Sequence, residues 1–299
     1  LGDVYKRQAS HPSAGHPADA GRRPGPYAGA MSRSLAYFTD LALRRHEGSE
    51  ITASSGCTVI RSPQNPTFWW GNFLLMPAPP LPGDLERWEA LFTQHHPGAA
   101  HRTFGVDVPD GEAGDTAAFL DAGYQVYRDT VLTAQRTHPP HRVNTDATFR
   151  PLATDADWAS AHALRMAVNA ADPDGHEETG YRDFTTRKLA AYRHAQTAGH
   201  GAMLGAFDGH GQMLAGLGIF DAGDGVARYQ SVETHPDARS RGLAGTLVHT
   251  AGEWAQAHLG TRTLVIVADP GYHAQRLYES VGFTPTEVQL AFQKRPQAG

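Results

Sequence analysis

The sequence lacks the features that mark several large protein classes. Its one cysteine, Cys57, excludes an intramolecular disulfide and fits a reducing compartment such as the cytoplasm. No apolar run reaches the length of a membrane span, and no signal peptide is evident. The net charge of −5 shows none of the cation excess that is typical of nucleic-acid-binding proteins. We therefore expect a cytoplasmic protein without a membrane or nucleic-acid partner.

Motifs for metal ions and nucleotides are missing too. There are 17 histidines, but His46 and His176, each followed by glutamate, do not continue into His-Glu-x-x-His. His138 and His141 lie in a proline-rich segment. No Gly-x-Gly-x-x-Gly and no Walker lysine follows the glycine-bearing turn near residue 242, which argues against a nucleotide-binding protein. We expect no metal ion.

What is present fits an ordinary globular protein. The composition is 40% hydrophobic and 19% charged, and 299 residues are enough for two ordinary domains or one large one, each with a sizeable core. Residues 1–30 are the exception: they are rich in Gly, Pro, Ala and His without any period. We expect a disordered or non-native leader there, with ordinary sequence starting at Met31.

In the N-terminal half, residues 31–137, segments with the helical hydrophobic period of about 3.6 residues alternate with segments typical of strands. Asp84 is predicted to cap the second helix. A polar, proline-bearing linker is expected over residues 138–146. The predicted elements are helices over residues 34–45, 84–95 and 116–122, and strands over residues 51–60, 72–76, 101–108 and 125–134.

The C-terminal half, residues 147–296, has a full set of its own. A hairpin is expected across the turn at residues 208–211. A short helix is also expected to end before Phe283. The other predicted helices cover residues 155–170, 181–197 and 245–258, and the strands cover residues 147–151, 202–207, 213–220, 226–234, 263–267 and 287–293.

The turn over residues 235–245 carries the clearest chemical signal. It follows a strand, contains glycine and opens a helix, so several backbone N–H groups are expected to point at one spot. The positive end of the helix dipole would add to them, which makes the spot suitable for a phosphate or pyrophosphate. Arg239 and Arg241 flank the turn and could pair with phosphate oxygens.

Two motifs in this region resemble a known family. Residues 239–244 read Arg-Ser-Arg-Gly-Leu-Ala, which fits the R/Q-x-x-G-x-G/A signature of the GCN5-related N-acetyltransferases. Residues 274–283 read Ala-Gln-Arg-Leu-Tyr-Glu-Ser-Val-Gly-Phe, which is similar to the family's A-x-x-L-Y-x-x-x-G-F hallmark. The resemblance covers roughly residues 148–295. It implies the acyl-CoA N-acyltransferase fold, an α/β (α+β) class with a mixed, mostly antiparallel twisted sheet flanked by helices.

An internal echo points to a tandem arrangement in two lobes. Residues 119–124 (Phe-Leu-Asp-Ala-Gly-Tyr) and the strand after them mirror residues 278–283 (Tyr-Glu-Ser-Val-Gly-Phe) and their strand. The N-terminal copy has the proline-rich turn 77–83 in place of the phosphate turn. We therefore expect residues 31–137 to form a degenerate acetyltransferase-like domain and residues 147–296 the catalytic domain.

The resemblance implies acetyl-CoA as co-substrate and gives roles to individual residues. Tyr278 would be the general acid that protonates the leaving thiolate. Val232, Glu233 and Thr234 would offer strand backbone groups to the pantetheine arm and the thioester. The residues expected to bind the cofactor are Val232, Glu233, Thr234, Arg239, Ser240, Arg241, Gly242, Leu243, Ala244, Gly245, Ala274 and Tyr278.

The general base stays open at this point. The alternatives to Glu233 are Asp269, His176, Glu177 and Glu178. We name Glu233 as the base because the resemblance places its strand beside the thioester. The sequence departs from the family at Gly271, where an asparagine is common seven residues before the tyrosine. That loses one contact to the cofactor. A non-catalytic acyl-CoA-binding regulatory module is therefore the alternative to an N-acetyltransferase.

The acceptor is read only as a primary amine, on a small molecule or a protein. Residues 65–72 hold an aromatic cluster that could line an acceptor pocket, although a core between the two domains is the stronger interpretation. His101 and Arg102 could add polar lining. A monomer and a homodimer are both compatible with the sequence.

Overall fold

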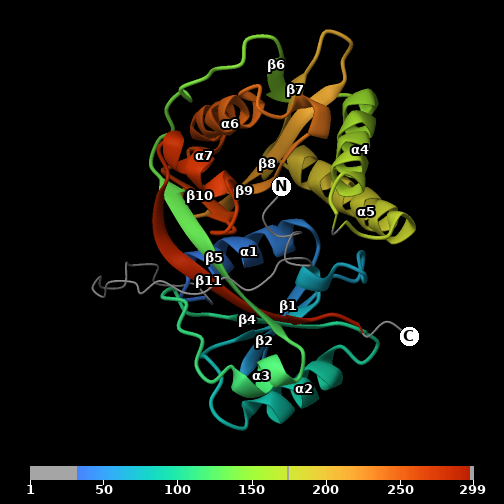
Figure 1. The fold of residues 1–299 in the computed structure, drawn as a ribbon, viewed down its shortest axis with the longest axis vertical. Coiled ribbons are helices and arrows are strands. Elements are labelled where there is room, and N and C mark those ends of the chain that lie inside the picture. Colours follow the sequence, from blue (N-terminus) through green and yellow to red (C-terminus); the bar gives the residue numbers. More distant parts are fainter. Residues whose placement is uncertain (1–31, 174, 297–299) are drawn as a thin grey trace.

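A computed structural model of the protein describes residues 32–173 and 175–296. Its strands form one sheet of 11, in the order β1-β2-β3-β4-β11-β5-β10-β9-β8-β7-β6. Figure 1 shows α2 and α3 at one end of the molecule and α4, α5, α6 and α7 at the other, with α1 between them. The predicted leader at residues 1–30 lies outside the described residues.

The N-terminal half builds one end of this sheet. Ser34 begins the first helix by accepting a hydrogen bond from the Tyr37 amide at 3.3 Å. The elements are α1 (Leu35–His46), β1 (Glu50–Ser54), β2 (Cys57–Arg61), β3 (Phe73–Met76), α2 (Asp84–His95), β4 (Arg102–Val106), α3 (Ala117–Asp121) and β5 (Gln125–Ala134).

The C-terminal half builds the other end. Thr154 and Asp157 form a reciprocal capping box at the start of α4, and Gly260, at φ 63°, ends α6. The elements are β6 (Thr148–Pro151), α4 (Asp155–Ala170), α5 (Glu178–Thr197), β7 (Gly201–Phe207), β8 (Met213–Gly223), β9 (Val226–Thr234), α6 (Leu243–Leu259), β10 (Thr263–Ala268), α7 (Ala274–Ser280) and β11 (Thr284–Lys294).

The two strands of the sequence echo exchange places. β11, the last strand of the chain, pairs antiparallel with both β4 and β5, and β5 pairs antiparallel with β10. Figure 1 shows β5 and β11 as two long strands side by side along the centre of the molecule. Each half therefore completes the sheet of the other. The division into residues 31–137 and 147–296 stays a prediction, and the backbone ladder crosses it.

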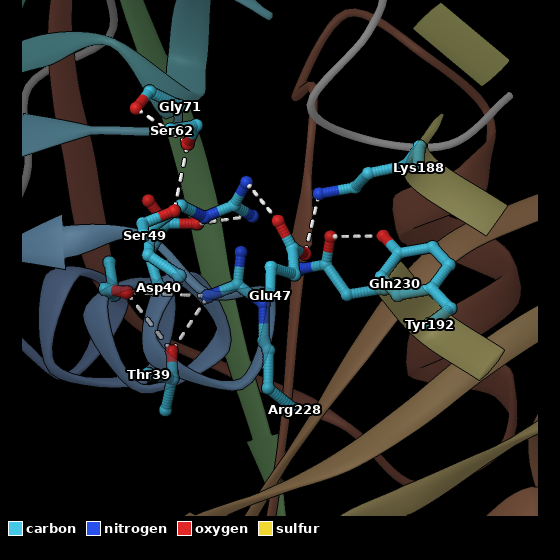
Figure 2. Close-up of polar contacts among 12 residues, drawn as sticks. Thr39, Asp40, Glu47, Ser49, Ser62, Gly71, Lys188, Tyr192, Arg228 and Gln230 are labelled. Atoms are coloured by element: carbon cyan, nitrogen blue, oxygen red, sulfur yellow. Dashed lines mark hydrogen bonds and ion pairs between the residues drawn. The ribbon is translucent and has the colours of Figure 1, made fainter. Parts of the chain in front are cut away.

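Helix α1 ties the halves together through buried charges. The Nη1 atom of its fully buried Arg44 lies 2.8 Å from Glu47 Oε2. The other carboxylate oxygen of Glu47, Oε1, lies 2.5 Å from Lys188 Nζ of α5. Arg228 of β9 donates to Thr39 of α1 at 2.8 Å. Figure 2 shows these contacts converging between α1, α5 and β9. An unpaired buried charge would be costly, so this network holds the halves in one arrangement.

The aromatic cluster at residues 65–72 belongs to the same interface. Phe68 and Trp70 are buried in a core shared with Tyr181 and Phe184 of α5. The Phe68 and Phe184 rings lie 5.5 Å apart, and the Trp70 indole donates to Gln293 Oε1 of β11 at 2.9 Å. These side chains fill a core between the halves, so their burial argues against an acceptor pocket lined by Phe68 and Trp70.

Two sequence predictions are corrected. Residues 51–60, expected as one strand, form the hairpin of β1 and β2, because Gly56 adopts φ 84° and reverses the chain. Asp84 is the first residue of α2, and Gly83 is the cap residue. The Asp84 carboxylate instead accepts a hydrogen bond from the Leu81 amide at 2.9 Å.

The predicted fold class is confirmed. The sheet is mixed and mostly antiparallel, with helices on its faces. Its parallel pairs, β3 with β4 and β9 with β10, occupy equivalent places in the two halves. The candidate active site lies beside the second of these pairs.

Candidate active site

A gap opens between β9 and β10. The two strands are paired only from Val226 to Arg228, opposite residues 263–265, although β9 continues to Thr234. Past this point β9 carries a bulge: its register against β8 shifts, and Ser231 has a positive φ of 50°. A bulge bends its strand and re-aims the residues that follow. The far half of β9 therefore diverges from β10.

The turn 235–245 closes one end of this gap. After β9, Pro236–Ala238 form a short 3-10 helix, and α6 begins at Leu243. Ser240 and Gly242 have φ values of 60° and 77°, so the backbone twice enters the left-handed region. Such conformations let successive N–H groups face one concavity, the arrangement of many anion sites. Arg239, Ser240 and Arg241 are exposed, so the turn is open to solvent.

Between the turn and α7 lies a pocket of about 320 Å³. Pockets of this size accommodate small ligands. The predicted cofactor-binding residues that line it are Val232, Thr234, Arg239, Ser240, Arg241, Gly242, Leu243, Ala244, Gly245, Ala274 and Tyr278.

Four further lining residues were not predicted: Ala238, Tyr272, His273 and Leu277. Leu277 could have been found, because it lies three residues after Ala274 on a helix and so shares its face. Tyr272 and His273 follow Gly271 in a loop, where no periodicity marks the inward side. His273 is the cap residue of α7.

Tyr278 forms part of the pocket wall and is 1% exposed. The amides of Val281 and Phe283 both donate to its carbonyl at 3.1 Å, which fixes the end of α7. Its ring packs against that of Phe283, with the centroids 6.4 Å apart. These contacts therefore fix Tyr278 in the pocket wall.

Glu233 is the one predicted cofactor-binding residue that does not line the pocket. Its side chain lies in the buried region beside α4, where Oε2 is 3.6 Å from Arg165 Nε. Both side chains are almost fully buried. Burial raises the pKa of the Glu233 carboxyl, and the Arg165 guanidinium opposes that rise. A carboxyl of this kind can exchange a proton nearer neutral pH than a solvated one.

The other base candidates have structural partners. Glu177 is the cap residue of α5: its carboxylate accepts from the Thr179 and Gly180 amides, both at 2.8 Å, and these bonds lower its pKa. Asp269 accepts from the Gly271 amide at 2.8 Å. These hydrogen bonds to nearby backbone amides give Glu177 and Asp269 a structural role, so neither carboxylate requires a catalytic one.

Glu178 and His176 complete that set. Glu178 pairs with Arg182 one helical turn later, at 2.5 Å and with both side chains exposed. The His176 ring stacks on Tyr181, with the centroids 5.5 Å apart. Neither residue lines the pocket beside the turn.

The corresponding place in the N-terminal half is filled. The loop before α3 packs onto the proline-rich turn, where the Asp115 amide donates to the Pro80 carbonyl at 2.8 Å. A Cβ at Gly114 would lie 2.4 Å from the same carbonyl oxygen. Phe119, the counterpart of Tyr278, is buried against Trp88 with the centroids 5.2 Å apart. In this half the loop before α3 therefore covers the proline-rich turn at Pro80.

The described residues hold neither a metal-binding cluster nor a membrane-spanning helix. No group of three or more His, Cys, Asp or Glu side chains is arranged to hold a metal ion there. Within residues 32–173 and 175–296, no helix is both long and apolar enough to cross a membrane.

Comparisons with known proteins agree with this geometry. Residues 162–283 match the model of the acetyltransferase (GNAT) family. The fold is similar to a GCN5-related N-acetyltransferase from Kribbella flavida, with 16% identity, a TM-score of 0.58 and 90% of this chain and 98% of that chain covered. It is also similar to a GCN5-related N-acetyltransferase from Sphaerobacter thermophilus, with 15% identity, a TM-score of 0.51 and 90% of this chain and 95% of that chain covered.

A functionally unknown conserved protein from Staphylococcus epidermidis has the same fold, with 15% identity, a TM-score of 0.61 and 82% of this chain and 93% of that chain covered. A comparison with the curated proteins found no match. At these identities the structural likeness establishes the fold.

Proposed function

We propose that the protein transfers an acetyl group from acetyl-CoA to a primary amine. Support comes from residues 162–283, which match the model of the acetyltransferase (GNAT) family. The observation that carries this proposal is the pocket of about 320 Å³ in which the open turn 239–245 and Tyr278 meet. A phosphate-binding turn and a proton donor within one cavity are what the reaction requires. The acceptor would be a small molecule or a protein amine.

The turn would hold the diphosphate of the cofactor. The amides of residues 240–245 and the first turn of α6 supply partial positive charge, and Arg239 and Arg241 add full charges at the rim. The bulged part of β9, around Val232, would present backbone groups to the pantetheine arm and to the thioester carbonyl. Donors aimed at that oxygen stabilise the charge that develops during acyl transfer.

The transfer itself needs three proton movements: the ammonium loses a proton before attack, the thiolate gains one, and the new amide nitrogen loses its second. Glu233, whose side chain lies outside the pocket, would accept the proton of the ammonium form of the acceptor through water, and the free amine then attacks the thioester carbonyl. As the new C–N bond forms and the C–S bond breaks, Tyr278 donates its proton to the leaving thiolate. The nitrogen loses its second proton to the Tyr278 phenolate, which restores the phenol and leaves a neutral amide. A phenol suits the second task because it is neutral at physiological pH. Burial, which raises the pKa of Glu233, suits the first.

The proposal places the reaction in the cytoplasm, because Cys57 is the one cysteine of the sequence and is buried as a free thiol. It requires no metal ion. One active site per chain is expected, because the loop before α3 packs onto the proline-rich turn of the other half.

Release of CoA from acetyl-CoA in the presence of a panel of amines tests the proposal. We expect amine-dependent release, which a thiol reagent detects. Tight binding of acetyl-CoA without release by any amine of the panel would favour the alternative, a non-catalytic acyl-CoA-binding regulatory module. That alternative draws support from Gly271, which offers no side chain to the cofactor.

A further inference from the structure

The linker between the two halves lies against the phosphate turn. Arg142 Nη1 donates to the Ser240 carbonyl at 2.8 Å, and Asn144 Nδ2 donates to the Arg241 carbonyl at 2.9 Å. The backbone N–H of Asn144 also donates to Thr246 Oγ1, in the first turn of α6, at 2.9 Å. The linker thus contacts two consecutive peptide units of the turn and the helix that follows it.

These contacts fix which way the peptide units face. The described chain has no cis peptide bonds, so in each unit the N–H points opposite to the C=O. With the Ser240 and Arg241 carbonyls bonded to the linker, the N–H groups of Arg241 and Gly242 are directed away from it. Arg241 and Gly242 line the pocket, whereas no residue of 138–146 does. The linker therefore aims these two amides toward the pocket.

Asn144 is itself held rigidly. It is 7% exposed, and its Oδ1 accepts from the Asp146 amide at 3.1 Å and from the Ala147 amide at 3.0 Å. Both ends of its side-chain amide are thus in use. Arg142 is exposed at its side chain, so its bond to Ser240 is the weaker restraint. The Arg142 backbone also packs closely on the turn, because a Cβ at Gly242 would lie 2.5 Å from the Arg142 carbonyl oxygen.

We propose that Asn144 is a positioning residue for the cofactor: it pre-orients the turn so that the Arg241 and Gly242 amides receive a diphosphate without rearrangement. The inference rests on the proposed use of acetyl-CoA. Donors that are already held in the bound conformation bind a ligand more tightly, because binding then costs less conformational entropy. Asn144 would then affect only ligands that carry the diphosphate.

Two acetyl donors separate this role from a general structural one. Acetyl-CoA carries the diphosphate, and S-acetylpantetheine lacks it while presenting the same thioester. For Asn144→Ala we expect the KM for acetyl-CoA to rise about tenfold, which corresponds to about 1.4 kcal/mol, with kcat nearly unchanged. The kcat/KM for S-acetylpantetheine should stay within about twofold of the original. An equal loss with both donors, or no loss with acetyl-CoA, would overturn the proposal.

A second variant removes the donor of the hydrogen bond to the Arg241 carbonyl and places a carboxylate beside that carbonyl. Asn144→Asp keeps an oxygen for the Asp146 and Ala147 amides but cannot donate to the Arg241 carbonyl. We expect it to raise the KM for acetyl-CoA at least as much as Asn144→Ala does, and an unchanged KM would refute the proposed contact. Val143→Ser is the matched control, because Val143 lies in the same linker and is 49% exposed. If the unaltered protein binds no acetyl-CoA at all, it is the proposed function that fails.

Discussion

Tyr278 is the residue on which turnover is expected to depend most. Tyr278→Phe removes the proposed proton donor and keeps the ring that packs on Phe283. We predict that kcat falls by about 10²-fold or more, the usual contribution of general acid catalysis, while the Kd for acetyl-CoA changes less than about twofold. Steady-state CoA release and calorimetric titration measure the two quantities.

A matched control for that variant is Tyr229→Phe. Tyr229 is also 1% exposed, and its hydroxyl donates to the Val248 carbonyl at 2.8 Å in the core. Losing that bond should lower stability by about 1 kcal/mol and leave kcat alone. If both variants retain full turnover, Tyr278 is only a core residue.

Glu233 gives the reaction an expected pH dependence. Burial raises the pKa of its carboxyl above the usual value. Only the deprotonated form accepts a proton, so kcat/KM should fall as the pH drops through that raised pKa. Glu233→Gln should lower kcat/KM and abolish this acidic limb. A pH profile with the same acidic limb in the variant would assign the base to another group.

At the scale of elements, the connection between α2 and β4 is expected to be acid-sensitive. Burial lowers the pKa of His96 and of His101 to about 4, from 6.5. Between these values the unfolded chain binds more protons than the folded one, so stability is full above about pH 6.5 and is lost as the pH falls toward 4. Within that window each histidine lowers the free energy of unfolding by up to about 1.4 kcal/mol for each pH unit of acidification.

Urea unfolding at pH 7 and at pH 5 measures this loss. His101→Gln, which can still donate to the Asn72 carbonyl now bonded by His101 at 3.0 Å, should make the free energy of unfolding less dependent on pH. An equal pH dependence in the variant would show that other groups govern acid unfolding.

The elements themselves were largely predictable from the sequence. The bounds predicted for residues 84–95, 125–134, 155–170 and 226–234 agree with those of the structure, because strong hydrophobic periods and caps mark them. The hairpin of β1 and β2 was missed because its turn has only two residues, Ser55 and Gly56, inside a continuous strand-like pattern. Contiguous parts of the pocket, such as residues 239–245, were predicted from one motif.

What could not be predicted depends on contacts between distant residues. Asn144 and Arg241 are 97 positions apart, so no local pattern relates them. Likewise the side chain of Glu233 lies against Arg165 on α4, and the alternation of a strand does not say what covers each face.

At the scale of the whole molecule, the exchange of β5 and β11 is the main finding. Because the two echo strands have similar patterns, the sequence does not specify which neighbours each takes, and only the folded chain decides. With β11 between β4 and β5, neither half keeps a complete sheet alone. The protein should therefore unfold as a single cooperative unit.

The buried charges between the halves give a quantitative test of that unity. Glu47→Gln removes the carboxylate between Arg44 and Lys188. We predict a loss of about 3–5 kcal/mol of stability, because it removes the carboxylate that pairs with buried Lys188 and leaves Arg44 with Asp40 alone. The whole molecule should still unfold in one transition, followed by circular dichroism in urea. Glu178→Gln, at the exposed pair with Arg182, is the control and should change stability by less than about 0.5 kcal/mol. Two separate transitions would contradict a single cooperative unit.

The central claim is that the turn 239–245 holds the diphosphate of acetyl-CoA, while the counterpart turn 77–83 does not. Isothermal titration of the full chain with acetyl-CoA tests it most directly. The account predicts saturable binding of one molecule per chain, lost when Gly242→Ala forces a side chain onto the Arg142 carbonyl at a positive φ of 77°. No binding, two molecules per chain, or unchanged binding by the Gly242 variant would contradict it.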